Sequence, residues 1–156
     1  GINTGHPNKL VEAAILGKKI KPLVGFAGLK REQKYGVNSR IDIQLDDETR
    51  GRAYVEVKNV HMSRKPGLAE FPDSVTERGA KHLVELGAMV RAGHRAAMVY
   101  LVQRGDVTKL SLARDVDPVY VGAFDKAAAA GVEMFALRCR MGIDGIEPDK
   151  VIPIVD

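Results

Sequence analysis

Long hydrophobic runs are absent from this sequence. The longest, AAMVYLV, covers only residues 96–102, whereas about 18 apolar residues are needed to cross a bilayer. The single cysteine, Cys139, has no partner for an internal disulfide, which is typical of a reducing compartment. The chain opens on Gly1 and shows no signal-peptide pattern. We therefore expect a cytoplasmic protein that does not associate with a membrane.

Internal repeats, low-complexity tracts and long linkers are also missing. The chain has 156 residues, of which 45% are hydrophobic and 28% are charged. That length supports one domain with a proper core, and the composition is that of an ordinary globular protein. We expect a single domain over residues 1–156.

Two common site patterns are not found. The four histidines, His6, His61, His82 and His94, lack the spacing of a zinc site. Gly25 and Gly28 lack the strand-to-helix setting of a dinucleotide-binding loop. Zinc and dinucleotide chemistry are therefore not indicated.

Basic charge is in modest excess. The formal net charge is +4 and the isoelectric point is near 9.2. Lysine and arginine cluster at residues 18–21, 29–34, 50–52 and 63–65. These clusters could contact the phosphates of a nucleic acid, or they could be solvated loops.

The periodicity of the sequence alternates between helix and strand. A first helix is predicted from Pro7 to a stop at Gly17, and a third from Asp117 to Gly131. Between them, a helix is predicted to end at Gly93 and to begin either at a capping box formed by Ser74 and Glu77 or at a cap by Asp73. Strands are predicted around 23–35, at 39–47, 52–60 and 96–103, and from Val132. Residues 61–72 show no periodicity and are predicted to be a loop. The order α-β-β-β-α-β-α-β predicts an α/β protein with a mixed central sheet flanked by helices.

The segments RIDIQL and YVEVKNV should form an antiparallel hairpin. If Ile41, Ile43 and Leu45 face the same core as Ala53, Val55 and Val57, the numbers of facing residues sum to an even number. Pairing Ile43 with Val55 gives a sum of 98, which places Asp42 opposite Glu56. Lys58 follows one pleat along on the same face.

Two carboxylates this close repel one another unless a cation or a shared proton lies between them. Oxygen ligands with retained waters suit Mg²⁺ better than Zn²⁺. A lysine beside them can orient or deprotonate an attacking water, or hold a phosphate oxygen. Asp42, Glu56 and Lys58 thus suit phosphodiester hydrolysis, although an acid and a lysine two residues apart on a strand are also common surface decoration.

Asp42 together with Glu56, Val57 and Lys58 resembles the motif of PD-(D/E)XK nucleases, with Ile41 in place of the motif's proline. The order of elements resembles their restriction-endonuclease-like core. Longer stretches are similar to the sugar fermentation stimulation protein family: GINTGHPNKLV, YGVNSRIDIQL, AYVEVKNVHM, FPDSVTERGAKHL, GHRAAMVYLVQR and DPVYVGAFDKAAAAGVEM.

The resemblance implies a role for each residue of the motif. Asp42 and Glu56 correspond to ligands of Mg²⁺ or Mn²⁺, and Lys58 corresponds to the catalytic lysine. The Pro72-Asp73 dipeptide follows this motif and so cannot supply its first aspartate.

The helix after the lysine strand can contribute further polar residues in such nucleases. Glu77 and Lys81 have the i, i+4 spacing for this role, as do Arg78 and His82, but each pair could instead be an exposed surface pair. Glu12 could add an acid, although an ordinary surface role is favoured.

The resemblance also implies DNA as a mostly sequence-nonspecific partner. It further implies an OB-fold-like DNA-binding domain upstream, which is expected to be absent from this chain. Three functions stay open: a Mg²⁺-dependent DNA nuclease, a non-catalytic DNA-binding regulatory protein linked to sugar metabolism, and a hydrolase of another phosphate ester. The sequence does not predict an oligomeric state.

Overall fold

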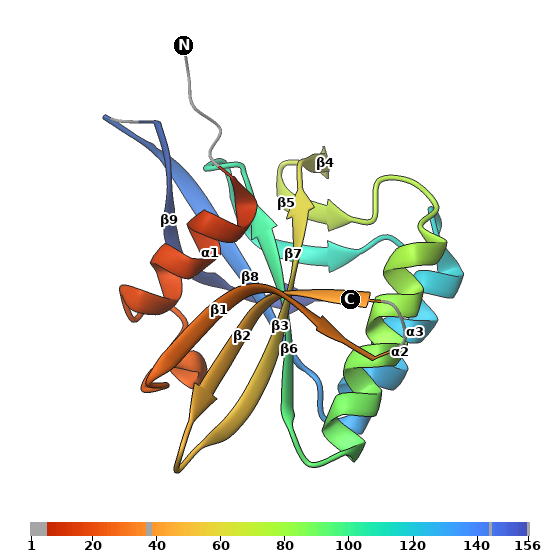
Figure 1. The fold of residues 1–156 in the computed structure, drawn as a ribbon. Helices are drawn as coiled ribbons and strands as arrows, with labels where there is room; N and C mark the ends of the chain where they lie inside the picture. Colours follow the sequence, from red (N-terminus) through yellow and green to blue (C-terminus); the bar gives the residue numbers. More distant parts are fainter. Residues whose placement is uncertain (1–5, 37–38, 144, 156) are drawn as a thin grey trace.

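A computed structural model describes residues 6–36, 39–143 and 145–155 (Figure 1). The predicted domain also includes residues 1–5, 37–38, 144 and 156, which lie outside this description. Within it the helices are α1 (Pro7–Leu16), the 3-10 turn η1 (Lys21–Leu23), α2 (Glu77–Arg91) and α3 (Pro118–Ala130). None of the helices in the described ranges is long and apolar enough to span a membrane.

The strands of the described residues form two sheets. The larger has the order β1 (Gly28–Tyr35), β2 (Ser39–Asp47), β3 (Gly51–Val60), β6 (Arg95–Val102), β8 (Glu133–Gly142) and β9 (Gly145–Ile152). Its centre is parallel, from β3 through β6 to β8, and the outer pairs are antiparallel. The smaller has the order β10 (Ile154–Val155), β7 (Val107–Leu112), β5 (Gly67–Phe71) and β4 (Met62–Lys65). The predicted α/β class with a mixed sheet is confirmed.

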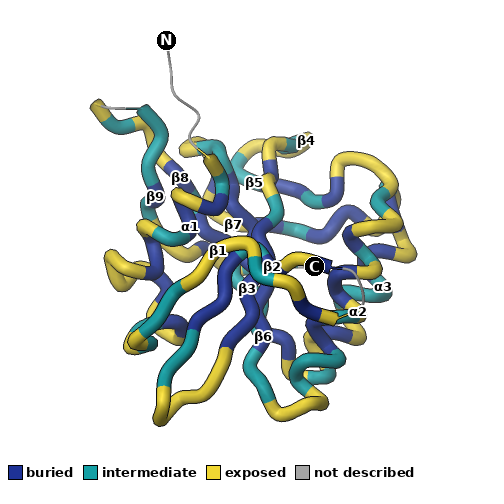
Figure 2. The backbone as a smooth tube through the Cα atoms, viewed as in Figure 1, coloured by how far each residue is buried: buried dark blue, intermediate teal, exposed yellow. Residues whose placement is uncertain are grey.

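The centre of the large sheet is buried on both faces, and β6 among its central strands is apolar from Ala96 to Val102. Along β6, Ala97, Val99 and Leu101 belong to the hydrophobic cluster that contains the buried stripe of α1. The alternate residues, among them Met98 and Tyr100, belong to the cluster that includes α2 and α3. Figure 2 shows these strands as the buried centre of the molecule. Helix α1 therefore lies on one face, and α2 and α3 lie on the other (Figure 1).

The register of the predicted hairpin is correct over most of its length. Ile43 pairs with Val55 and Leu45 with Ala53. The ladder begins at Ile43, however, so the expected backbone pairing of Asp42 with Glu56 does not form. Ile41 packs in the cluster on the α2 side, whereas Ile43 packs on the α1 side. The expectation that Ile41 shares a face with Ile43 is wrong, because β2 changes face at Asp42.

The neighbouring strand β1 is irregular at the same level. Its pairs with β2 include Arg31 with Ile43 and Gln33 with Ile41, but skip Glu32 and Asp42. Glu32 has φ +56, the left-handed region that a residue with a Cβ rarely adopts. Such local strain concentrates at functional sites. The sheet is thus interrupted on both sides of Asp42.

The predicted loop at residues 61–72 is wrong. These residues form β4 and β5, which pair with each other and, through β5, with β7. A register shift lies within each of these pairings, which removes the alternation of a regular strand. The partner strand β7 begins some 40 residues later, a long-range pairing that local sequence does not reveal.

The structure corrects the predicted N-cap of α2 and confirms that of α3. Helix α2 begins at Glu77, and its N-cap is Thr76, whose hydroxyl accepts a hydrogen bond from the Gly79 amide at 3.0 Å. Neither Ser74 nor Asp73 is the cap. Asp117 caps α3 as expected and also accepts the Thr76 amide at 2.8 Å. This hydrogen bond therefore links the N-terminal end of α2 to that of α3.

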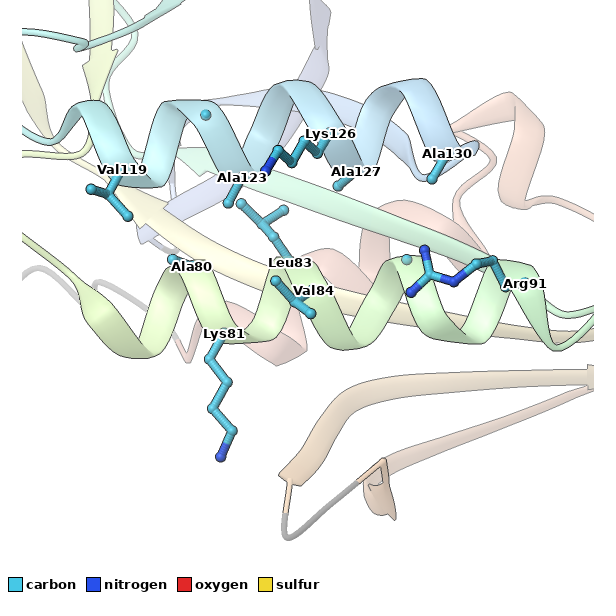
Figure 3. A pocket seen from close by; sticks show the side chains of 12 residues that line it. Ala80, Lys81, Leu83, Val84, Arg91, Val119, Ala123, Lys126, Ala127 and Ala130 are labelled. Carbon is cyan, nitrogen blue, oxygen red and sulfur yellow. The ribbon is translucent and has the colours of Figure 1, made fainter.

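Helices α2 and α3 pack side by side, and a groove of about 560 Å³ runs between them (Figure 3). Small residues, among them Ala80, Ala123 and Ala127, line this groove and allow close approach. Lys81 points away from α3 in this view. The side of α2 that carries His82 and Glu85 is left free to face β2 and β3.

Candidate functional site

The carboxylate of Asp42 lies at the interruption of the sheet. Its Oδ2 accepts the backbone N–H of Val57 at 2.7 Å, and its Oδ1 accepts a hydrogen bond from Asn8 Nδ2 at 3.1 Å. Asn8 is a buried residue in the first turn of α1. A side chain on β2 thus takes the place of a backbone acceptor toward β3. This fixes the Asp42 carboxylate beside Glu56.

Glu56 is the buried acid of the site, with only 4% of its surface exposed. Burial, and then the charge of the nearby Asp42 carboxylate, raise the pKa of Glu56 to about 9. Its Oε2 atom is buried and has no hydrogen-bond partner among the described residues. The two acids are therefore brought together as predicted, although Asp42 reaches Glu56 through its side chain and not through strand pairing.

Lys58 and Glu56 both lie close to His82, a histidine on α2. The Lys58 Nζ lies 3.3 Å from His82 Nδ1, and the same Nδ1 lies 3.5 Å from Glu56 Oε1. Burial and the charges of Lys58 and Arg78 lower the pKa of His82. Because an ammonium group only donates, the neutral His82 must accept at Nδ1 and carry its proton on Nε2. We call Asp42, Glu56, Lys58 and His82 the acid–lysine cluster.

A groove leads from the surface to this cluster. It measures about 550 Å³ and is lined by Ser39, Arg40, Glu77, Arg78, Lys81 and His82. Three of these residues are cations and one is an acid, and the positive charge of Arg78 reaches Glu56 and lowers its pKa in part. A second cavity shares Ser39 and Arg40 and adds Lys34. We call the two together the basic groove.

The other predicted helix residues take different places. Glu77 and Lys81 line the basic groove at exposed positions and do not enter the acid–lysine cluster. Lys81 Nζ lies 3.9 Å from Glu85 Oε1, so its ion pair is with Glu85 and not with Glu77. Of the two i, i+4 pairs considered, Arg78 and His82 are the ones near the acids. Glu12 forms a surface ion pair with Arg31 at 3.6 Å, which fits the surface role favoured for it.

Sequence reasoning did not single out Ser39, Glu85 or Tyr35. Ser39 Oγ donates to Glu85 Oε1 at 2.7 Å. Burial and the charges of Glu56, Glu85 and Asp42 raise the pKa of Tyr35 above its usual range, which places its ring near all three acids. Among the described residues, the buried side-chain oxygens that lack a partner are Tyr35 Oη, Glu56 Oε2 and Glu85 Oε2. The one sequence feature that could have indicated Glu85 is its helical spacing, since it lies one turn beyond His82 on the same helix face.

The donor set can be tested against a metal ion. The described residues contain no group of three or more histidine, cysteine, aspartate or glutamate side chains arranged to hold one. Two adjacent carboxylates remain, and one buried oxygen of Glu56 lacks a partner. All of these are hard oxygen donors. They fit a divalent cation that keeps several waters, as Mg²⁺ does, and they do not fit a closed structural site.

These features define a mixed α/β domain with an acid pair and a lysine at an interruption of its central sheet. The sequence model described as "Sugar fermentation stimulation protein RE domain" matches residues 5–145. The chain belongs to this family, as its sequence resemblance implied.

Known relatives agree with this assignment. The sugar fermentation stimulation protein homologs of Brucella ovis and Brucella canis are each 56% identical over 156 residues, which is 100% of this chain and 66% of each relative. The structure of Pyrococcus furiosus SfsA in complex with Ca²⁺ superposes with a TM-score of 0.83 at 28% identity. That match covers 96% of this chain and 64% of the other. The chain therefore spans about two thirds of the length of these relatives.

Proposed function

We propose that this domain is a divalent-cation-dependent phosphodiester hydrolase that acts on nucleic acid, with a restriction-endonuclease-like core. The observation that carries the proposal is the convergence of Asp42, Glu56 and Lys58 at one interruption of the sheet. A buried acid pair with an unpartnered oxygen is costly unless something compensates its charge. A cation held by both carboxylates would compensate it.

Asp42 and Glu56 would hold the cation, Mg²⁺ or Mn²⁺. When bound, it would supply Lewis acidity and a water molecule of lowered pKa. The relative solved with Ca²⁺ supports a divalent ion over a monovalent one. Because the pKa of Glu56 is about 9, proton and cation compete for this carboxylate.

Lys58 would hold a non-bridging phosphate oxygen or orient the attacking water. The neutral His82 accepts a hydrogen bond from Lys58 and so keeps the ammonium beside Glu56. This contact restrains the long lysine side chain without adding a second positive charge at neutral pH. His82 is therefore assigned to positioning Lys58.

The basic groove supports a polyanionic substrate. Arg40, Arg78 and Lys81 line it at exposed positions, and it ends at His82. Phosphate contacts of this kind supply affinity without reading the base sequence. We therefore propose DNA, bound mostly without sequence preference, as the partner.

Cleavage of supercoiled plasmid and single-stranded DNA tests the proposal. Wild type should cleave with Mg²⁺ or Mn²⁺ and not with EDTA, and Lys58→Ala and Asp42→Asn should each lose at least about 100-fold in rate. A matched control is Lys109→Ala, an exposed lysine on β7. Equal activity in all four proteins would indicate contamination and contradict the proposal.

A second candidate is a DNA-binding regulatory domain with an idle site, linked to sugar metabolism. It is favoured by the lack of a third acid or histidine ligand among the described residues and by the proton that Glu56 retains at neutral pH. It predicts salt-sensitive DNA binding without cation-dependent cleavage. If this chain does not bind DNA even at low salt, this second candidate function is contradicted for the chain.

A further inference from the structure

The first residues of β2 are attached to helix α2 and not to β3. The ladder between β2 and β3 begins only at Ile43, so Ser39 to Asp42 have no backbone pairs with β3. Ile41 is fully buried in the cluster that includes α2 residues. This half-strand carries Asp42, whose carboxylate links it to the backbone of β3 at the Val57 amide. Its backbone pairs, at Ser39, Arg40 and Ile41, are with the edge strand β1, so its position relative to α2 and β3 depends on side-chain contacts.

A buried hydrogen bond provides that attachment. Ser39 is 7% exposed, and its hydroxyl donates to Glu85 Oε1 at 2.7 Å. The Glu85 side chain is 12% exposed, and Lys81 Nζ lies 3.9 Å from the same oxygen. Ser39 is three residues before Asp42, and Glu85 is one helical turn after His82. The bond therefore joins the strand that carries one acid to the helix that carries the histidine.

The end of β1 closes over the same carboxylate. Gly36 has φ +58, and a Cβ added there would lie 2.6 Å from Glu85 Oε2. Only glycine allows the backbone to approach this closely in that conformation. Tyr35, 6% exposed, is near enough to Glu85 for the Glu85 charge to raise the pKa of its hydroxyl. Glu85 is thus enclosed by the β1–β2 side of the sheet.

We propose that Glu85 and Ser39 are positioning residues that place the Asp42 carboxylate on the Val57 amide beside Glu56. Without their bond, the half-strand is held by the packing of Ile41 and by its pairing with β1, and Asp42 is less closely fixed on the Val57 amide. The consequence for catalysis rests on the proposed function, but the positioning itself does not. Glu85 is not expected to contact the cation or the substrate, and Ser39, although it lines the basic groove, donates its hydroxyl to Glu85.

The Val57 amide reports the position of Asp42 directly. In NMR spectra of the wild-type protein it should be shifted downfield and exchange slowly, because it donates to a carboxylate at 2.7 Å. Ser39→Ala and Glu85→Ala should shift it upfield and speed its exchange on the order of tenfold. Glu85→Gln should retain the wild-type signal, because the glutamine oxygen still accepts from Ser39.

Matched controls come from the second sheet. Ser63 donates to the Lys65 carbonyl, and the buried Glu70 binds Arg64. Ser63→Ala and Glu70→Ala should leave the Val57 amide unchanged. If Ser39→Ala and Glu85→Ala lower the melting temperature but leave that amide where it is, the two residues are merely structural and the inference is wrong.

Mn²⁺ titration separates this inference from the proposed function. If wild type binds Mn²⁺, Ser39→Ala and Glu85→Ala should weaken binding on the order of tenfold, and Glu85→Gln should restore it. Unchanged Mn²⁺ affinity in both alanine variants would overturn the inference. If wild type binds no Mn²⁺, the proposed function fails, and the Val57 amide still decides the positioning role.

Discussion

The Asp42 carboxylate accepts the backbone N–H of Val57 at 2.7 Å, although Asp42 and Val57 are on different strands that do not pair at this level. The side chain completes a hydrogen bond that a strand backbone would otherwise make. The same carboxylate raises the pKa of Glu56. This one hydrogen bond therefore links β2 to β3 where their backbones do not pair, and it also places the two acids side by side.

Substitutions at Asp42 should separate these two effects. Asp42→Asn and Asp42→Ala both remove the charge, but only asparagine keeps an acceptor for the Val57 amide. Asp42→Ala should therefore be less stable than Asp42→Asn by about 1–3 kcal/mol in urea unfolding, the cost of a buried donor left unpaired. Equal stabilities of the two variants would show that the amide does not depend on this acceptor.

The free energy of unfolding should decrease as the pH rises, because of Glu56. Its pKa is about 9 in the fold against 4.5 for the ordinary group. Between these values the folded state holds a proton that the unfolded state has lost, so stability decreases as pH rises from about 4.5 to 9. Glu56→Gln should remove this slope and be more stable than wild type at pH 8 by a few kcal/mol. Thermal melts from pH 5 to 9 measure this, and parallel slopes in the two proteins would contradict it.

A divalent cation should reverse that trend. Because it binds the ionised carboxylate, it competes with the proton and stabilises the fold more at high pH. Added Mn²⁺ should raise the melting temperature of wild type more at pH 8 than at pH 6, and should not raise that of Glu56→Gln. A shift of the same size in both proteins would place the Mn²⁺ elsewhere.

The core offers a prediction that is independent of function. Tyr100 and Tyr120 are fully buried, and their hydroxyls share a hydrogen bond at 2.6 Å. Tyr100→Phe or Tyr120→Phe alone should cost about 1–3 kcal/mol, because each leaves one buried hydroxyl unpaired. The double variant should cost less than the sum of the two, since no orphan hydroxyl remains. Additive losses in urea unfolding would show that each hydroxyl has another partner.

Salt dependence tests the basic groove. If Arg40 and Arg78 contact phosphates, each alanine variant should weaken DNA binding for all sequences and reduce the slope of log affinity against log salt by about 1. Lys109→Ala should have no effect on the slope. Fluorescence anisotropy with a labelled oligonucleotide, titrated at salt concentrations from roughly 50 to roughly 300 mM, measures this slope. Unchanged slopes would place the DNA on another surface.

The sequence predicted the parts of this molecule that follow regular periodicity. Register parity correctly predicts Ile43 opposite Val55, because both strands are regular there and bury one face. The same parity is wrong at Ile41, since β2 changes face at Asp42. The left-handed Glu32 and the Ser39–Glu85 hydrogen bond accompany this change, and neither has a local sequence pattern. Asp42 and Glu56 still came together, through a side-chain hydrogen bond that register arithmetic does not contain.

Long-range relationships account for the other differences. Strands β4 and β5 were predicted as a loop because their partner β7 lies far along the chain and their pairing is irregular. From the sequence, His82 is a possible zinc ligand without the required spacing and the i, i+4 partner of Arg78. Its contacts with Lys58 and Glu56 depend on how α2 lies across β3, which spacing within one helix cannot give.

The most direct measurement is a crystal structure of the protein soaked in MnCl₂, with anomalous differences recorded to locate the metal. A peak is expected between the carboxylates of Asp42 and Glu56, with Lys58 nearby, and it should be lost in Asp42→Asn crystals. Carboxylates that point apart, or a peak only at another place in wild type, would contradict this expectation.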